Sequence, residues 1–178
     1  DVRAVNDWKT RARRTLDALL TNDPDSVEEN GFELIASTWV NTGSLFRPTL
    51  NELVNGGQMN LISDDALRAR IAAADAQFTY RSDLIQILAT AQPSFVGQVQ
   101  NRLRPTPGEV YVVTYDFEAL ANDDAFINAL GHALRNSHVN HIWLTQMVDI
   151  ADALRIAVAE EIGADTNPVA CEPPETAP

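Results

Sequence analysis

The sequence predicts an all-α protein: an up-and-down bundle of four main helices, with short accessory helices and one short extended segment. Apolar residues recur at helical spacing over four long segments, which is the pattern of helices that bury one face. Clusters of Pro, Gly, Asn and Asp separate these segments, and the connections are short enough for neighbouring helices to run antiparallel. Only residues 110–115 have the β-branched and aromatic composition of a strand.

The first half of the chain is expected to hold two main helices and a short one. The first covers about residues 1–20. The second begins near Ser26, which follows a turn rich in helix breakers and can act as an N-cap. A short helix is expected at 49–55, because Pro48 suits the start of a helix and the two glycines at 56–57 favour its end.

The second half is expected to hold the two longest helices. One covers about residues 64–103, with Ser63 as its N-cap and a kink or break at Pro93. A short helix begins at Asp116, and the longest helix covers about 123–162. The predicted seam of this last helix is apolar at both ends and polar in the middle, and comprises Ile127, Leu130, Leu134, Leu144, Val148, Ala151, Leu154, Val158 and Ile162.

We expect one domain over residues 1–162, followed by an irregular, Pro-rich tail over 163–178. The tail holds Cys171, the only cysteine, so the chain cannot form an internal disulfide. Hydrophobic residues make up 45% of the 178 positions, which is enough for a real core. The net charge of -12 argues against nucleic acid as a partner, because phosphate binding requires a basic surface.

Basic residues are concentrated at the start of this acidic chain. Five of the 13 Lys and Arg residues lie within the first 14 positions. They form either the solvated face of an amphipathic helix or a segment close to anionic lipid headgroups. Trp8 is either a core aromatic or an anchor at the membrane interface. The candidate membrane-proximal residues are Arg3, Trp8, Lys9, Arg11, Arg13 and Arg14.

A polar stretch, residues 135–141, interrupts the longest helix and contains two of the three histidines. Its candidate ligand-binding residues are Asn136, Ser137, His138 and His141. The two histidines are three positions apart and can share a helix face. The Glu-x-x-His pattern of di-iron bundles is absent and no cysteine is nearby, so we predict neither a metal nor a cofactor. A solvated stretch and a polar ligand pocket remain the alternatives.

No sequence motif indicates an enzyme. The paired glycines at 56–57 lack the lysine and spacing of a phosphate-binding loop. The nucleophile-elbow, zinc-protease and Ser-x-x-Lys patterns are also absent. We therefore expect no catalytic residues and no catalytic activity.

Several stretches of the sequence carry motifs that occur together in one protein family. A T-x-x-E-L…G…L-I…L-R signature is matched by Thr49, Glu52, Leu53, Gly57, Leu61, Ile62, Leu67 and Arg68. Residues 5–12, VNDWKTRA, precede this signature, and residues 114–120 and 132–138 follow it. With these motifs the chain resembles a group of uncharacterised bacterial single-span membrane proteins, in which an Asn-Trp-Asn-like exit follows the span and a later landmark follows the signature. The resemblance implies a membrane span upstream of Asp1 and transfers no activity.

These observations predict an extracytoplasmic interaction or accessory domain, held at the bacterial inner membrane and facing the periplasm. Its expected partner is another protein or a larger membrane complex. The alternative is a ligand-sensing helical bundle with a polar pocket near residues 135–141.

Overall fold

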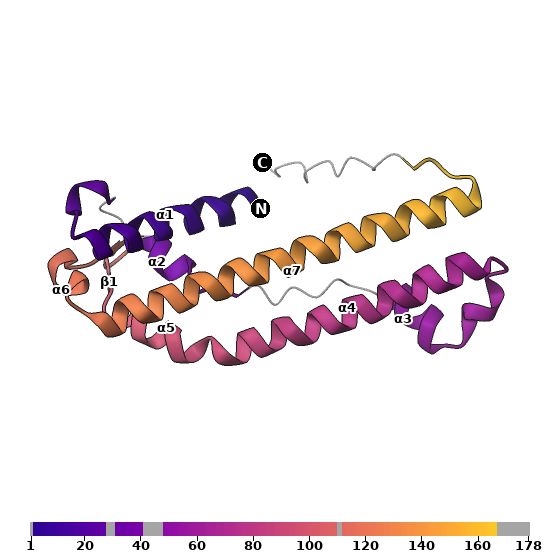
Figure 1. Ribbon diagram of the computed structural model, residues 1–178, viewed down its shortest axis with the longest axis horizontal. Coiled ribbons are helices and arrows are strands. Elements are labelled where there is room, and N and C mark those ends of the chain that lie inside the picture. The colour runs from indigo at the N-terminus through magenta and orange to yellow at the C-terminus, as the bar shows by residue number, and fades with distance from the viewer. Residues whose placement is uncertain (1, 28–30, 41–47, 110–111, 167–178) are drawn as a thin grey trace. The chain divides into compact units, whose positions relative to one another are not determined.

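Helices dominate the structure. The computed structural model describes residues 2–27, 31–40, 48–109 and 112–166, with side chains from Trp8 onward (Figure 1). Helices make up 77% of the chain, which confirms the all-α prediction. The long helices are α1 (Val2–Thr21), α4 (Asp65–Ala91) and α7 (Asp124–Ile162). The shorter elements are η1 (Pro24–Ser26), α2 (Phe32–Ala36), α3 (Pro48–Asn55), η2 (Gln58–Leu61), α5 (Pro93–Gln100), β1 (Arg104–Pro105), β2 (Val113–Thr114) and α6 (Phe117–Ala121).

The chain divides into two compact units. The first contains Asp1–Leu45 and Tyr80–Thr145, and the second contains Phe46–Thr79 and Gln146–Pro178. Both α4 and α7 contribute one end to each unit. The sequence predicted one domain over 1–162, and each unit has its own cluster of buried apolar side chains within that range.

The core of the first unit joins α1, α2, α5, β2, α6 and the start of α7. Each of these elements contributes at least one apolar side chain that is almost fully buried. Burial of a large apolar side chain stabilises a fold by roughly 1.5–3 kcal/mol, so this shared core fixes α1 beside α7. Its buried members are Ala12, Leu19, Leu34, Val99, Leu103, Val113, Leu120, Phe126, Ala129 and Leu130.

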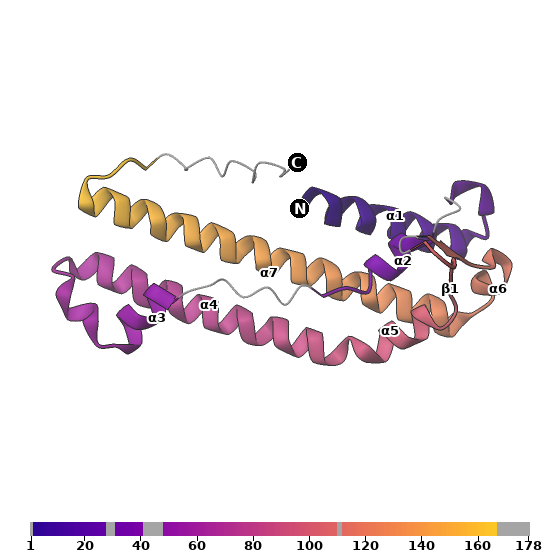
Figure 2. The same ribbon diagram turned by 180° about the vertical axis from the view of Figure 1, so that it is seen from behind.

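The extended segment has a partner that the sequence did not reveal. β2 pairs antiparallel with β1, with Arg104 opposite Thr114 and Pro105 opposite Val113. Gly108 turns the chain between them with φ +84°, a conformation that glycine adopts without a Cβ clash. The hairpin and α6 lie close to the start of α7 in both views (Figures 1 and 2). Residues 110–111 of the predicted strand lie outside the described residues.

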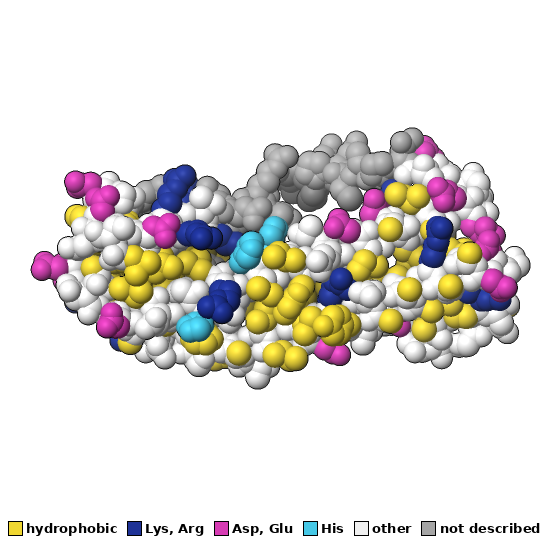
Figure 3. All heavy atoms as spheres, in the orientation of Figure 1, with side chains coloured by type: hydrophobic (Ala, Val, Ile, Leu, Met, Phe, Trp, Pro, Cys, Tyr) yellow, Lys and Arg dark blue, Asp and Glu magenta, His cyan; other side chains and the backbone are white. Residues whose placement is uncertain are grey.

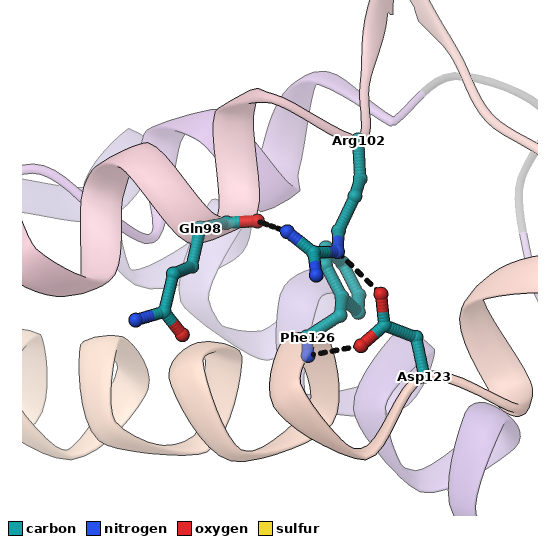
Figure 4. Close-up of polar contacts among 4 residues, drawn as sticks. All are labelled: Gln98, Arg102, Asp123 and Phe126. Carbon is teal, nitrogen blue, oxygen red and sulfur yellow. Dashed lines mark hydrogen bonds and ion pairs between the residues drawn. The ribbon is translucent and has the colours of Figure 1, made fainter.

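A polar clamp fixes the start of α7, as Figure 4 shows. Asp123 caps the helix, because one carboxylate oxygen accepts a hydrogen bond from the main-chain N–H of Phe126 at 2.9 Å. Its other oxygen pairs with Arg102, whose guanidinium also donates to the main-chain oxygen of Gln98 at 3.0 Å. The hydrogen bond from Arg102, followed by that from Phe126, lowers the pKa of Asp123. The clamp ties the end of α5 to the first turn of α7.

The second unit has a smaller core. Leu67 and Ile71 from α4 are buried with Ala157 from α7. Partly buried side chains complete this core: Leu50, Leu53, Val54, Met59, Ile62 and Leu154. As predicted, α3 begins at Pro48 and a left-handed glycine follows it, Gly57 with φ +72°.

Two predicted helix starts are wrong. Asp64, not Ser63, caps α4, and its carboxylate accepts the N–H of Leu67 at 2.7 Å. The second helix does not begin at Ser26, whose hydroxyl donates to the main-chain oxygen of Asp23 at 3.0 Å, and Val27 is extended. Such side chains bond the local backbone and so compete with helix formation. Residues 28–30 and 41–47, which include part of the predicted second helix, lie outside the described residues.

The long helices confirm one prediction and correct another. The predicted break at Pro93 is confirmed, because α4 ends at Ala91 and α5 starts at the proline. On α7 the predicted seam holds at Leu130, which is 0% exposed, but Val148 is 59% and Ile162 is 71% exposed. The two ends of α7 pack in separate units, so a single straight stripe along the helix is not required.

Candidate ligand-binding groove

The first unit contains a groove between α1 and α7, which run antiparallel (Figure 1). Lys9 Nζ donates a hydrogen bond to the main-chain oxygen of Ser137 at 3.0 Å and so joins the two helices. The groove has a volume of about 470 Å³. We call it the α1–α7 groove. It is lined from α1 by Lys9, Thr10, Arg13, Leu16 and Asp17, and from α7 by Gly131, Leu134, Arg135, His138 and His141.

The groove is basic although the protein as a whole is acidic. Lys9, Arg13 and Arg135 line it, and Asp17 is the one acidic residue among its described lining. Within the described part of the chain, neither Arg13 nor Arg135 forms an ion pair with a carboxylate. Figure 3 shows Lys, Arg and His side chains gathered on the face where α1 lies beside α7. The site therefore concentrates positive charge from two opposing helices.

Burial alters the chemistry of Lys9. Its side chain is half-buried, and this desolvation lowers the pKa of the ammonium group. The ammonium has lost part of its hydration, and within the described residues the Ser137 carbonyl is the one hydrogen-bond partner that replaces it. A negatively charged group bound in the groove would restore the lost electrostatic stabilisation.

His141 lies near the same charge. Burial lowers its pKa most, and the positive charges of Lys9 and His138 lower it further. His141 is half-buried and His138 is exposed. An anion placed between these groups would favour the imidazolium form of His141, because it would offset the repulsion from Lys9.

One glycine keeps the groove open. Gly131 lies inside α7, where glycine is less favourable than alanine by roughly 1 kcal/mol. A Cβ added there would meet no atom within 4 Å, so close packing does not require the glycine. The neighbouring walls are apolar, formed by Leu16 and Leu134. The open space above Gly131 is thus part of the groove.

The predicted ligand stretch divides between two faces of α7. His138 and His141 line the groove, but Asn136 and Ser137 do not. The Asn136 amide donates to Gln92 Oε1 at 3.1 Å, and Gln92 Nε2 donates in turn to the main-chain oxygen of Thr38 at 2.7 Å. The side chain of Ser137 is buried, with the residue 2% exposed. Asn136 thus serves a network that holds α7 to the α4–α5 junction.

The basic cluster also divides between two faces, here of α1. Lys9 and Arg13 line the groove, whereas Arg11 and Arg14 line a separate cavity of about 40 Å³. That cavity contains Glu33, which is 5% exposed and accepts a hydrogen bond from the Thr15 hydroxyl at 3.3 Å. The side chain of Arg3 lies outside the described residues.

Glu33 in this second cavity affects the nearby Tyr115. Burial, and then the charge of Glu33, raise the pKa of Tyr115 to about 12, although a hydrogen bond with Thr15 opposes the rise. Gly31 packs so closely on Tyr115 that an added Cβ would lie 2.7 Å from the ring. We call the space lined by Arg11, Arg14, Thr15, Ser26, Val27 and Glu33 the Glu33 cavity.

Trp8 is part of an aromatic cluster. Its ring makes edge-to-face contacts with Phe32, at 5.6 Å between centroids, and with Trp39, at 5.9 Å. Phe32 and Trp39 also meet edge to face, at 5.8 Å. These contacts support the core-aromatic interpretation of Trp8, and Trp39 remains 49% exposed.

Sequence reasoning missed Arg135 and Gly131 as members of the site. The lining positions on α7 are 131, 134, 135, 138 and 141, and those on α1 are 9, 10, 13, 16 and 17. Each set has the spacing of one helix face. That spacing could have grouped the residues within each helix, but it does not say which helix lies opposite.

Among the described residues, no group of three or more His, Cys, Asp or Glu side chains is placed to hold a metal ion. No helix in the same residues combines the length and apolar composition needed to cross a bilayer. Comparison with protein-family models, with characterised proteins and with solved structures gives no match to this chain.

Proposed function

We propose that this chain is a ligand-binding module whose α1–α7 groove holds a small molecule. The observation that carries the proposal is the convergence of charged and apolar side chains from two helices on one groove of about 470 Å³. Ligand sites typically have volumes of roughly 300–1,000 Å³ and combine apolar walls with a few polar groups. Gly131, which leaves space where packing would admit a side chain, supports the same proposal.

The proposed activity is binding without catalysis, in the manner of a sensor. A molecule in the groove would contact α1 and α7 together and so stabilise their association. The resemblance described above supports an extracytoplasmic setting at the bacterial inner membrane. In that setting, ligand binding would change how firmly α1 is held against α7.

A second candidate function is an interaction module for a protein partner or a larger membrane complex. The cluster of Trp8, Phe32 and Trp39 favours it, because Trp39 is 49% exposed. Tryptophan is enriched among the residues that dominate binding energy at protein interfaces. Under this function a Trp39→Ala variant would lose the partner and keep any ligand bound in the groove.

The ligand-binding proposal is tested by a fragment screen followed by ¹⁵N NMR. We expect bound fragments to shift the amide signals of Leu16, Gly131 and Leu134. A Gly131→Leu variant places a side chain in the groove and should abolish those shifts, whereas Gly131→Ala should retain most of them. If no fragment shifts the groove amides, or if Gly131→Leu binds as well as wild type, the proposal is wrong.

A further inference from the structure

We infer that the groove takes a small organic anion, with a carboxylate or phosphate headgroup and a short apolar tail. This inference rests on the proposed function and adds the chemical class of the ligand. It follows from the order in which basic and apolar residues occur along the groove.

The headgroup is placed by the basic residues. Lys9 and Arg13 lie one turn apart on α1, and Arg135 faces them from α7. In the empty groove these cations repel one another, and Arg13 and Arg135 have no ion pair within the described residues. A carboxylate or phosphate removes this repulsion and accepts charge-assisted hydrogen bonds from more than one donor.

The tail is placed by the antiparallel direction of the helices. Lys9 lies beside Ser137, so the basic end of the groove comprises Lys9, His138 and His141. Seven residues further along α1, Leu16 lines the groove with Gly131 and Leu134. The lining thus changes from basic to apolar along its length, and it matches a molecule that is charged at one end.

Asp17 fixes the orientation of such a molecule. It lies next to Leu16 at the apolar end and is the one acidic residue among the described lining. Its carboxylate would repel an anionic headgroup from that end and leave the headgroup among the cations. A neutral apolar molecule has no such preference, and a cation would be repelled by the groups at the basic end.

The net charge limits the size of the anion. A protein with a net charge of -12 repels long polyanions, which extend beyond a local basic site. A compact anion inside the groove is exposed mainly to the nearby cations, because salt screens charges beyond about 8 Å at physiological ionic strength. The structure therefore favours a small ligand over a nucleic acid or an acidic protein.

The experiment uses four probes that separate charge from apolar area: hexanoate, hexyl phosphate, 1-hexanol and acetate. Titration calorimetry on the full chain should show hexanoate or hexyl phosphate binding at least about tenfold more tightly than hexanol, a difference of 1.4 kcal/mol. Acetate, which has the charge without the tail, should also bind at least tenfold more weakly than hexanoate. The ratio of the two hexyl anions distinguishes a carboxylate from a phosphate ligand.

Paired variants test the location. Arg13→Gln combined with Arg135→Gln should at least halve the preference for hexanoate over hexanol, because two of the cations that line the groove are lost and Lys9 remains. Arg70→Gln combined with Arg104→Gln is the matched control: it removes the same net charge from exposed positions that do not line the groove, and should bind like wild type. Amide spectra establish that each variant is folded.

The outcomes separate this inference from the proposed function. If hexanol binds in the groove as tightly as hexanoate, the groove binds ligands but the anion inference is wrong. If fragments bind the groove and all four probes fail, the inference is again wrong and the function stands. If neither fragments nor probes bind the groove, both are wrong.

Discussion

The α1–α7 groove and the Glu33 cavity lie on different faces of the same helix, and each receives two cations from the basic cluster. Lys9 and Arg13 line the groove, whereas Arg11 and Arg14 line the cavity. The groove has a volume of about 470 Å³, and the cavity only about 40 Å³. A short run of basic residues thus lines a large basic site on one face and a small cavity with a buried acid on the other.

The difference between the two regions is one of partners. Around the cavity, the buried Glu33 accepts a hydrogen bond from Thr15, and its charge helps to raise the pKa of Tyr115. In the groove, Arg13 and Arg135 have no carboxylate partner within the described residues. A buried carboxylate that accepts a hydrogen bond contributes to the fold, because its removal leaves a buried donor short of an acceptor. Exposed cations without an ion pair contribute little to stability and can bind a ligand. Substitutions should therefore affect stability at the cavity and binding at the groove.

The largest expected effect concerns the core that supports both regions. Leu130 is fully buried beside Gly131, so Leu130→Ala should destabilise the protein by about 2–5 kcal/mol. Leu144 is only half-buried, so Leu144→Ala should cost less. Denaturant unfolding of both variants measures the difference. Equal losses would show that the burial of Leu130 does not determine its contribution.

The next prediction tests the contrast directly. Glu33→Ala removes a buried carboxylate that accepts a hydrogen bond from the Thr15 hydroxyl, and should cost about 1–3 kcal/mol of stability. It should also lower the pKa of Tyr115 from about 12, which absorbance titration of the phenol measures. Arg135→Gln removes an exposed side chain and should change stability by no more than about 0.5 kcal/mol, yet weaken hexanoate binding. A large stability loss in Arg135→Gln would contradict the division between the regions.

A smaller effect, of opposite sign, is expected at two helical glycines. Gly131 and Gly97 both have open space where a Cβ would lie. Alanine at either position should therefore stabilise the protein by about 0.5–1 kcal/mol, the difference in helix propensity. Thermal unfolding measures both changes. Gly97 does not line the groove, so Gly97→Ala should leave hexanoate binding unchanged. If Gly131→Ala changes hexanoate binding and Gly97→Ala does not, the ligand lies against α7.

The sequence predicted the elements of the fold better than their contacts. Helical periodicity and Pro93 identified α4, α5 and α7, because these depend on local backbone preferences. A main helix was predicted to begin near Ser26, whereas α2 covers only Phe32–Ala36. The hydroxyls of Ser37 and Thr38 bond back to the main-chain oxygens of Leu34 and Ile35, at 2.7 and 2.6 Å, as the helix ends. Whether a hydroxyl competes with helix formation in this way depends on the local backbone geometry, which the spacing of apolar residues does not indicate.

Only part of the candidate site was predicted, because a local sequence pattern does not show which helices lie side by side. His138 and His141 were singled out because polar residues interrupt an apolar seam. Their basic partners, Lys9 and Arg13, come from a helix more than 100 residues earlier, and periodicity within one helix cannot identify its neighbour. Asn136 was assigned to a ligand, but it bonds to Gln92, which is buried between the end of α4 and the start of α5.

The smallest predicted effect is the response to pH. As pH falls, the stability of the ligand-free protein should fall, whereas its affinity for an anion should rise. Burial, and then the positive charges of Lys9 and His138, lower the pKa of His141. Without a ligand, the imidazole of His141 therefore binds a proton less readily in the folded protein than in the unfolded chain. The stability from neutral His141 is therefore present above the unfolded pKa and is lost as pH falls through the folded pKa.

With hexanoate bound, the sign for binding is reversed. The anion favours protonated His141, so affinity should rise by about 1.5- to 5-fold as pH falls from 8 to 6, which corresponds to 0.2–1 kcal/mol for a partly exposed charge pair. The charged and titratable residues that line the groove with His141 are Lys9, Arg13 and Asp17 on α1, and Arg135 and His138 on α7. The imidazole of His141 therefore carries the predicted pH response. Calorimetry at several pH values measures this change in affinity, and His141→Gln should reduce its dependence on pH.

A pH titration followed by NMR is the second test. Hexanoate should raise the pKa of His141 and leave the signals of His132 unchanged, because the His132 ring stacks on Phe95 outside the groove. An affinity that is independent of pH, or that falls on acidification, would show that the headgroup does not lie beside His141.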